Sequence, residues 1–511
     1  MTGSINTHNT NKQVIREENI RLILGLKVRM KRQELQMSLS ELAKKADMSV
    51  SYLNEIEKGK KYPKRSKILA LSGALGVSYD QLVSLKISKK LGALSDLLTS
   101  DILHELPLDV FGIEPRNLIE LMSDAPAKLS AFVNTIVEIS RNYALTVESL
   151  YFSVLRSYQE MHDNYFEEIE RLADSFREEF LSGERSKGEV LREYLQKECG
   201  YAIDEEKLGQ EEVLNSFRSV LKEEGGKKLL LVNKNLNERQ RCFIFTREIA
   251  YHLMELEERS NTYSWLKVAS FDVLLNDYKA TYFAGAVALP EAMLVEDLNE
   301  ILNADEFRAE TFVEKMRFRK ASPETYIHRL TSMLPKNFEL NKLFFLRLDH
   351  MPGENQYLLT KELHLDGLHS PHGTVLSEHY CRRWVSLKVF QQLEEHLAQG
   401  GDSNAVVCSA QISRYITSGK EYFCISIARP TPSPSTEKTH TSITIGFLMN
   451  DAFKQRFKFW RSEKLKVEFV NETCERCPAS DCSVRAAKPS VLERQKKETE
   501  LNKALTSLMA E

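Results

Sequence analysis

Three cysteines near the end of the sequence have a spacing that suits metal binding. In ETCERCPASDCSVRAAKP, Cys474, Cys477 and Cys482 form a C-x2-C-x4-C pattern. Two thiolates separated by two residues can chelate one ion, and a third nearby can reach the same ion. A tetrahedral site needs a fourth ligand, for which Cys381 is the first candidate, followed by His379, His372 and His440. Structural zinc, reduced cysteines without metal and a redox switch are three interpretations of this pattern.

A second candidate site lies in the stretch FTREIAYHL, residues 245–253. The helix of a zinc peptidase carries HExxH, with two imidazoles on one helical face and a glutamate that activates a bound water. Here Arg247 and Tyr251 stand in the two histidine positions, while Glu248 keeps the glutamate position. His252 is one residue out of register, about 100° around the helix. Because arginine cannot release a proton to become a ligand, we expect no enzymatic activity.

The elements that must position such residues begin with a basic segment. Between Arg21 and Lys67 there are thirteen Lys/Arg and five Asp/Glu, a local charge of +8 in a chain whose net charge is −3. A basic domain on an acidic body is typical of a nucleic-acid-binding protein.

Local signals in this segment predict short helices. Ser38 and Glu41 form a capping-box pattern that opens a helix over residues 40–46. Ser49 predicts the start of a further helix, which Gly59 ends. Two short helices joined by a tight turn are typical of a helix-turn-helix, whose second helix enters the major groove of DNA.

The pieces SLSELAKKADMS, SYLNEIEKGKKYP and LALSGALGVSYDQL resemble the lambda-repressor-like (Xre) family of DNA-binding domains. The resemblance implies double-stranded DNA as a partner. By position, the residues that face base edges are Ser49, Val50, Ser51, Asn54 and Glu55, and those near phosphates are Lys44, Lys58, Lys60, Lys61 and Lys64. Family members often place a phosphate-binding Gln where this chain has Leu39.

Residues 189–335 resemble an IrrE-type domain, a minimal metallopeptidase-like fold found behind helix-turn-helix domains. LREYLQKECGYAI predicts a helix that enters a strand, and LLLVNKNLNERQRCFIFTREIAYHLMEL predicts a strand, a loop and a long helix. In active relatives a later helix supplies a carboxylate ligand, and the matching position in KATYFAGAVALP holds Lys279. The resemblance therefore implies a degenerate site formed by Arg247, Glu248, Tyr251, His252 and Lys279.

From residue 341 onward, alternating and β-branched segments predict five strands, with helices at QQLEEHLA and AFKQRFKFW. The cysteine cluster, with Asp481, Arg485 and Pro489, resembles the C-terminal domain of the short-chain fatty acid (acyl-CoA) regulator family. That resemblance implies a short-chain acyl-CoA or fatty acid as effector.

The predicted fold class is multidomain, with an all-α helix-turn-helix domain at the N-terminus, a helical connector and an α+β body. The predicted domains are the helix-turn-helix at 20–85, a helical connector or dimerisation region at 86–188, the degenerate peptidase-like domain at 189–335, a sensor-like domain with the cysteine cluster at 336–490, and a tail helix at 491–511. Eight cysteines, no apolar run of membrane-spanning length and no signal-peptide pattern favour a cytoplasmic protein without membrane contact.

We therefore expect a sequence-specific transcriptional regulator, acting as a homodimer, that responds to a small-molecule effector. Two alternatives stay open: a cryptic metallopeptidase with zinc held by Glu248 and His252, and a helix-turn-helix scaffold protein without promoter control.

Overall fold

The computed structural model describes most of the chain. The described residues are 20–84, 147–365 and 378–510, with gaps at 22, 26, 211–213, 215–216, 225, 261–269, 403 and 432–438. The chain divides into two units, residues 1–154 with 270–272, and residues 155–269 with 273–511. Within the described part, no helix is long and apolar enough to cross a membrane.

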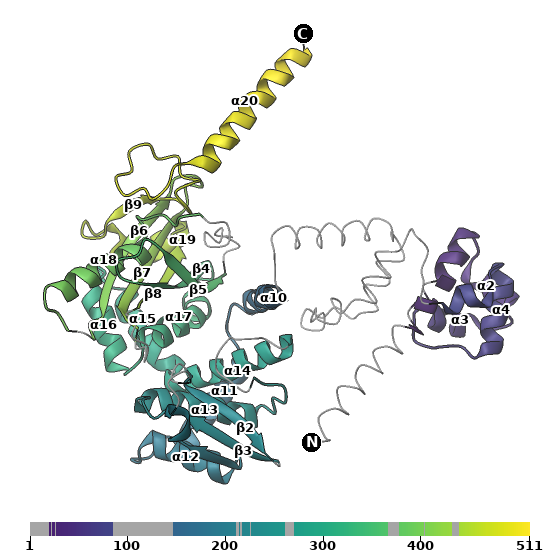
Figure 1. Cartoon of the computed structure of the whole chain (residues 1–511), viewed down its shortest axis with the longest axis horizontal. Coiled ribbons are helices and arrows are strands. Elements are labelled where there is room, and N and C mark those ends of the chain that lie inside the picture. Colours follow the sequence, from purple (N-terminus) through teal and green to yellow (C-terminus); the bar gives the residue numbers. More distant parts are fainter. Residues whose placement is uncertain are drawn as a thin grey trace. The chain divides into compact units, whose positions relative to one another are not determined.

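The N-terminal domain is a bundle of short helices (Figure 1). Residues 27–34 are helical, and they are followed by α2 (Leu39–Lys45), α3 (Val50–Glu57), α4 (Arg65–Leu75) and α5 (Tyr79–Val83). The predicted capping box is present, because the side chains of Ser38 and Glu41 each accept the other's backbone N–H. Leu42, Leu53 and Ile56 are completely buried, so all of these helices share one core.

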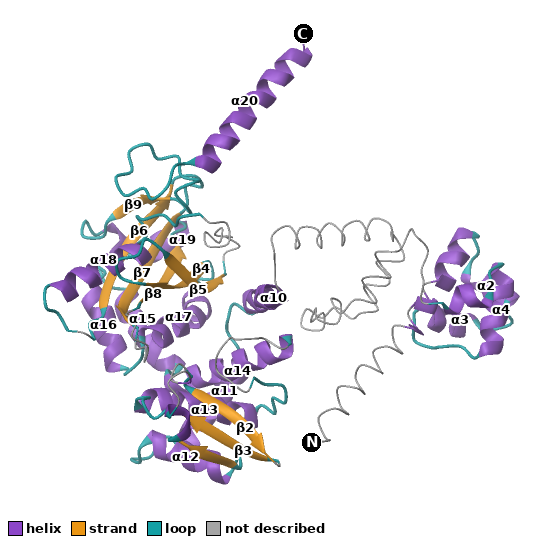
Figure 2. Ribbon diagram, viewed as in Figure 1, coloured by secondary structure: helices purple, strands orange, loops and turns teal. Residues whose placement is uncertain are grey.

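The second unit contains two mixed sheets (Figure 2). The smaller has the strand order β1-β3-β2, with β1 (Tyr201–Asp204) parallel and β2 (Ser219–Glu224) antiparallel to β3 (Lys227–Val232). Its helices are α11 (Glu167–Phe180), α12 (Lys187–Lys197), α13 (Glu238–Leu253) and α14 (Phe271–Ala288), preceded by α10 (Val147–Met161). The expected order of helix, strand, strand and long helix is present in α12, β1, β3 and α13.

The larger sheet has the strand order β5-β4-β8-β7-β6-β9 (Figure 2). Its strands are β4 (Leu343–His350), β5 (Tyr357–His364), β6 (Val407–Tyr415), β7 (Glu421–Pro430), β8 (His440–Leu448) and β9 (Val467–Val470). All neighbours are antiparallel except β6 and β9, which are parallel. Five of these strands match the expected ones, whereas β5 was not expected.

Helices cover both faces of the larger sheet. Phe344, Leu346 and Leu348 of β4 pack against α18 (Val385–Ala398). Phe345, one residue out of phase, packs on the other face with α15 (Glu291–Leu302), α16 (Ala309–Phe318) and α17 (Pro323–Phe338). A strand buried on both faces needs apolar residues without alternation, which explains the run LFFL in β4.

The expected domain boundaries fall inside helices. The boundary at 188/189 lies within α12, and the boundary at 335/336 lies within α17. Helices α15 to α17 share a core with the six-stranded sheet, so they belong structurally to that sheet. Of the expected connector at 86–188, residues 86–146 lie outside the described residues.

The remaining elements of the second unit are short except for the helix at its end. They are the 3-10 turns η3 (Lys207–Gly209) and η5 (Phe459–Arg461), and the helices α19 (Asp451–Arg456) and α20 (Ser490–Ala510). The expected tail helix at 491–511 is present as α20, whose residues 493–509 are all exposed.

Candidate functional site

Helix α3 presents its first turn to solvent and buries its opposite side. The hydroxyl of Ser49 accepts the backbone N–H of Tyr52 at 3.1 Å, which caps the helix. Of the residues predicted to face base edges, Ser49, Val50 and Ser51 are exposed, and Asn54 and Glu55 are half-buried. Val50 is 43% exposed. Small exposed side chains at the start of a helix are what insertion into a major groove requires.

The residues predicted to lie near phosphates precede and follow this helix in the sequence. Lys44, Lys60, Lys61 and Lys64 are exposed, and Lys58 is half-buried. Lys61 Nζ lies 3.0 Å from the Glu55 carboxylate. The pair joins the loop after α3 to the helix, so a DNA contact by either side chain competes with their mutual attraction.

A buried ion pair fixes the orientation of α3 within its domain. Arg32 donates two hydrogen bonds to Glu57, at 2.7 and 2.8 Å, and a third to the carbonyl of Met37 at 2.9 Å. Glu57 is 4% exposed. The first helix also lies directly against the end of α3, because a Cβ placed on Gly25 would come 2.2 Å from the carbonyl oxygen of Ile56. Only glycine fits at that approach.

In the second unit, helix α13 carries the residues in the HExxH register. Asn237 and Gln240 form a capping box at its start. Arg247 and Glu248 are 2% and 1% exposed, so both charges lie inside the protein. Charges buried to this extent must be paired.

A closed cluster of charges provides this pairing. Arg259 Nη2 lies 2.5 Å from Glu248 Oε2, and Arg247 Nη2 lies 3.5 Å from Glu248 Oε1. The hydroxyl of Tyr201 donates to Glu248 Oε2 at 3.2 Å. Arg259 also stacks on the Tyr251 ring, 4.1 Å from its centroid. Glu248 is therefore neutralised by two arginines and is not positioned as a free base.

The second acid of this cluster is Asp277 of α14. Arg247 Nη1 lies 3.2 Å from its carboxylate, and the Tyr251 hydroxyl donates to it at 3.3 Å. Sequence reasoning missed this residue because it looked for a carboxylate in the position of Lys279. Lys279 is half-buried two residues further along α14, and within the described part of the chain it makes no hydrogen bond or ion pair with Glu248.

His252 lies on another side of α13. It is exposed, whereas Glu248 one turn earlier is buried. A shared metal ion would need both side chains to face one point. Glu248 and His252 thus face different surroundings, and the Glu248 carboxylate is already paired with Arg247 and Arg259.

Two segments far apart in the sequence bring the cysteines together. An isolated bridge pairs Tyr380 with Thr473, and the Cys474 N–H donates to the carbonyl of His379 at 2.8 Å. Cys381, Cys474 and Cys477 are 6%, 5% and 7% exposed, and Cys482 is half-buried. Burial raises the pKa of the Cys381 thiol to about 11, and the nearby Cys474 and Cys477 add to this rise.

Hydrogen bonds hold the cysteine loop in place. The Arg485 guanidinium donates to the carbonyls of Cys474 at 2.8 Å and Cys477 at 3.3 Å. The Ala486 N–H lies 3.4 Å from the Cys474 sulfur. Arg485, which carried part of the sequence resemblance, therefore positions the loop that contains the first two cysteines.

The alternative fourth ligands point elsewhere. His379 Nδ1 lies 2.7 Å from the Glu475 carboxylate, and His440 lies beside Glu394 at 3.9 Å. His372 lies outside the described residues. Among the side chains that the structure describes, no three His, Cys, Asp or Glu residues are placed to hold a metal ion together. Cys381 lies close enough to Cys474 and Cys477 for their charges to raise the pKa of its thiol.

The class of the N-terminal unit follows from this geometry and from comparison with known proteins. Residues 28–82 match the helix-turn-helix family. The chain therefore contains an Xre-type helix-turn-helix domain, which supports a DNA-binding transcription regulator.

Solved structures give further likenesses. A Mycobacterium tuberculosis transcriptional regulator is 16% identical, with a TM-score of 0.48, over 66% of this chain and 93% of that chain. The apo form of the competence regulator ComR from Streptococcus vestibularis is 15% identical, with a TM-score of 0.12, over 61% and 96% of the two chains. Apo ComR from S. thermophilus is 14% identical, with a TM-score of 0.12, over 62% and 100%. No curated protein matches the chain.

Proposed function

We propose that the protein is a sequence-specific transcriptional regulator that binds double-stranded DNA through α3 and responds to a small-molecule effector. The observation that carries the proposal is the exposed first turn of a capped, firmly packed helix, with exposed lysines before and after it in the sequence. Phosphate contacts from such lysines position a helix, and its side chains then read base edges.

The test of this proposal is selection of fragmented genomic DNA by the full chain at roughly 150 mM salt, where binding to phosphates alone is weakened. A regulator recovers a few sites that share a palindromic motif. The Asn54→Ala variant should lose the motif, whereas Ser66→Ala, an exposed residue of α4, should keep it. Recovery without any motif would overturn the proposal and favour a scaffold role.

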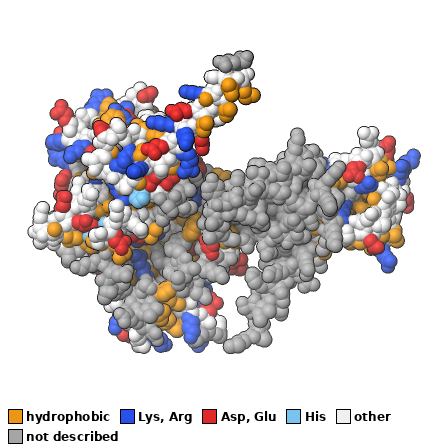
Figure 3. Space-filling view, turned by 45° about the horizontal axis from the view of Figure 1, so that its top comes forward, with side chains coloured by type: hydrophobic (Ala, Val, Ile, Leu, Met, Phe, Trp, Pro, Cys, Tyr) orange, Lys and Arg blue, Asp and Glu red, His pale blue; other side chains and the backbone are white. Residues whose placement is uncertain are grey.

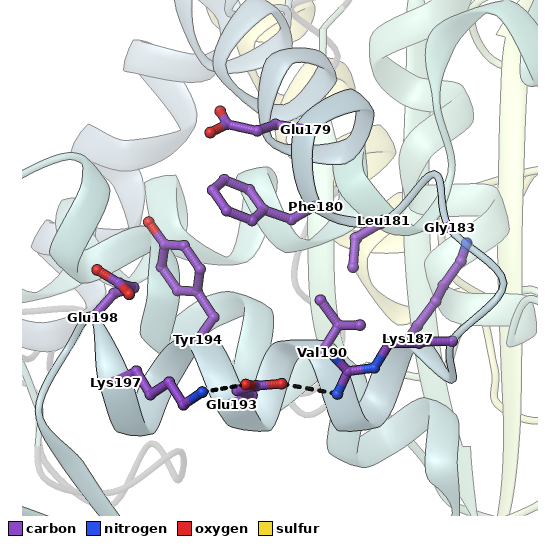
Figure 4. A pocket seen from close by; sticks show the side chains of 11 residues that line it. Glu179, Phe180, Leu181, Gly183, Lys187, Val190, Glu193, Tyr194, Lys197 and Glu198 are labelled. Carbon is purple, nitrogen blue, oxygen red and sulfur yellow. Dashed lines mark hydrogen bonds and ion pairs between the residues drawn. The ribbon is translucent and has the colours of Figure 1, made fainter.

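A pocket of about 410 Å³ between α11 and α12 offers a place for the effector (Figure 4). Phe180 and Tyr194 pack edge to face with ring centroids 4.9 Å apart, and Leu181 and Val190 extend this apolar lining. Basic side chains from Arg185, Lys187 and Lys197 surround it. An apolar slot with basic groups at its rim suits an acyl chain that carries a charged group.

Ion pairs already occupy part of this rim. Glu193 lies between two cations, with Lys197 at 2.5 Å and Arg185 at 2.8 Å, and Figure 4 shows the contact with Lys197. These two partners hold the pKa of Glu193 at about 2. A short-chain acyl-CoA or fatty acid is the effector that we propose, and calorimetric titration with acetyl-CoA and with butyrate distinguishes the two. A Tyr194→Ala variant that binds either compound as tightly as the unmodified chain would exclude this pocket.

We further propose that the regulator acts as a homodimer and that α20 contributes to it. Leu501, Leu505 and Leu508 are 55%, 53% and 70% exposed, and their spacing places them on one face of the helix. Figure 3 shows hydrophobic side chains on the surface of this protruding helix. Because an isolated helix is marginally stable in water, such a face gains from burial against a second copy. Light scattering on the full chain and on Leu505→Asp tests this, and a monomeric unmodified chain would refute it.

Zinc is the cofactor that we propose for the cysteine cluster, held by Cys381, Cys474, Cys477 and Cys482. The support is the approach of two buried segments that carry thiols. Such an ion would link these segments structurally. Reduced cysteines and a redox pair are the other outcomes of the zinc measurement described below.

A further inference from the structure

One end of the six-stranded sheet carries charged side chains on a face that is otherwise apolar. On the face covered by α17, Ile443 of β8 lies opposite Arg347 of β4, which in turn lies opposite Lys361 of β5. Two residues further along, Thr441 pairs with both Asp349 and Arg429. Because residues two apart in a strand share a face, these side chains form one group at the end of the core (strands β4, β5, β7 and β8 in Figure 1).

The group contains both carboxylates and cations. The single carboxylate facing it from α17 is Glu324, whose oxygens lie 2.5 Å from Lys361 and 3.9 Å from Arg347. Asp349 lies 3.5 Å from Arg347 and accepts the Thr441 hydroxyl at 2.6 Å. The four cations are Arg218, Arg347, Lys361 and Arg429.

The pKa of Glu324 reflects the cations around this carboxylate. Burial by itself would raise its pKa, but Lys361, Arg347 and Arg218 hold the pKa of Glu324 at about 2. The same surroundings act on Arg429. Burial lowers the pKa of Arg429, and the nearby charges of Arg218 and Arg347 lower it further, against the attraction of Glu324.

Two donors in the group have no acceptor. The Nε atoms of Arg347 and Arg429 are buried and lack a hydrogen-bond partner among the described residues. Arg429 also has no carboxylate within ion-pair distance in that part of the chain, and its guanidinium cannot lose its charge at ordinary pH. A buried donor without a partner costs about 1–3 kcal/mol, more for a charged group.

We propose that this group, centred on Arg347, Lys361 and Arg429, is a binding site for a small anion, a phosphate or carboxylate group of a small molecule. The planar fork of a guanidinium matches both groups, and each bond to it is charge-assisted. A bound anion would give Arg429 a negatively charged partner and accept hydrogen bonds from the two orphaned Nε donors. None of these residues lines the pocket between α11 and α12, and the proposal does not depend on DNA binding.

Thermal unfolding of the full chain in phosphate, acetate and chloride at equal ionic strength tests the proposal. A bound anion raises the unfolding temperature above its value in chloride. Stabilisation by phosphate alone that Arg429→Gln removes identifies a phosphate site, and stabilisation by acetate alone that the variant removes identifies a carboxylate site. An unfolding temperature that is the same in all three salts would overturn the proposal.

The Arg429→Gln variant locates the effect. Its apparent dissociation constant for the stabilising anion should rise at least about tenfold, the loss expected for a hydrogen bond to a charged group. In chloride it should unfold at the same or a higher temperature, because one repelling charge is gone. The control is Arg414→Gln in β6, whose guanidinium pairs with Glu421 and is 44% exposed. The site would be refuted if the two variants responded equally to the anion. It would also be refuted if Arg429→Gln unfolded in chloride at a lower temperature than the unmodified chain.

Discussion

Replacing Glu248 with glutamine tests whether helix α13 carries a self-neutralised charge cluster. In the unmodified chain Glu248 is 1% exposed and faces Arg259 at 2.5 Å and Arg247 at 3.5 Å. Glutamine has nearly the same shape but no charge. After the substitution both guanidinium groups remain buried, and Asp277 still pairs with Arg247.

The expected loss of stability is large. Breaking a buried ion pair by removing one partner costs about 3–5 kcal/mol, because the other charge is left uncompensated. The glutamine oxygen still accepts hydrogen bonds, so we expect the lower end, about 3 kcal/mol. Since about 1.4 kcal/mol corresponds to a factor of ten, the ratio of folded to unfolded body falls by about two orders of magnitude.

Urea unfolding followed by circular dichroism measures this loss. The double variant Glu248→Leu with Arg259→Met should be more stable than Glu248→Gln, because it removes the charges in pairs. The matched control is Glu167→Gln, which breaks the exposed pair between Glu167 and Arg171 at 2.6 Å and should leave the midpoint unchanged.

An unchanged midpoint in Glu248→Gln would refute the cluster. So would a zinc-dependent rise in the midpoint that Glu248→Gln abolishes, because it would mean that the carboxylate binds a metal ion. That second outcome would revive the metallopeptidase hypothesis.

Three further predictions concern other parts of the chain. Gly25→Ala should destabilise the helix-turn-helix domain by about 1–3 kcal/mol, because the added methyl group meets backbone atoms. Calorimetry should show this loss as a lower unfolding temperature of the domain. Burial lowers the pKa of His328 to about 4 from the ordinary 6.5, so stability should fall as pH decreases from 6.5 towards 4. His328→Phe should flatten that pH dependence of the urea midpoint; an unchanged slope would contradict the assignment. If the cysteine cluster binds zinc, Cys477→Ser should reduce the metal content measured by mass spectrometry, whereas Cys424→Ser in β7 should not; no zinc in the unmodified protein would favour reduced cysteines or a redox pair.

Local signals explain which parts of the fold were predictable. The caps at Ser38 and Ser49 bond to backbone groups three residues away, so the sequence itself contains both partners. The central strands were recognised because burial on both faces demands continuous apolar runs. Strand β5 was missed because it lies at the edge of the sheet, mixes Lys361 with leucines, and has an irregular register opposite Arg347 and Leu348.

The candidate sites show where local reasoning ends. Arg247 and Tyr251 were recognised as poor metal ligands from their chemistry alone. Their true partners were not predictable, since Asp277 and Arg259 reach α13 through the tertiary fold. The spacing of the cysteines was visible in the sequence, but the approach of Cys381 depends on the bridge between Tyr380 and Thr473. Long-range pairing of this kind leaves no local pattern.

The acids of the α13 cluster are paired with cations that belong to the chain rather than with a dissolved metal ion. Its positive charges belong to Arg247 and Arg259, which are covalent parts of the chain. A dissociable cation leaves when its free concentration falls below its dissociation constant, and its release would uncover Glu248 and Asp277 together. Built-in arginines cannot be chelated, exchanged or diluted. Glu248 and Asp277 therefore each have a positively charged partner within the chain itself.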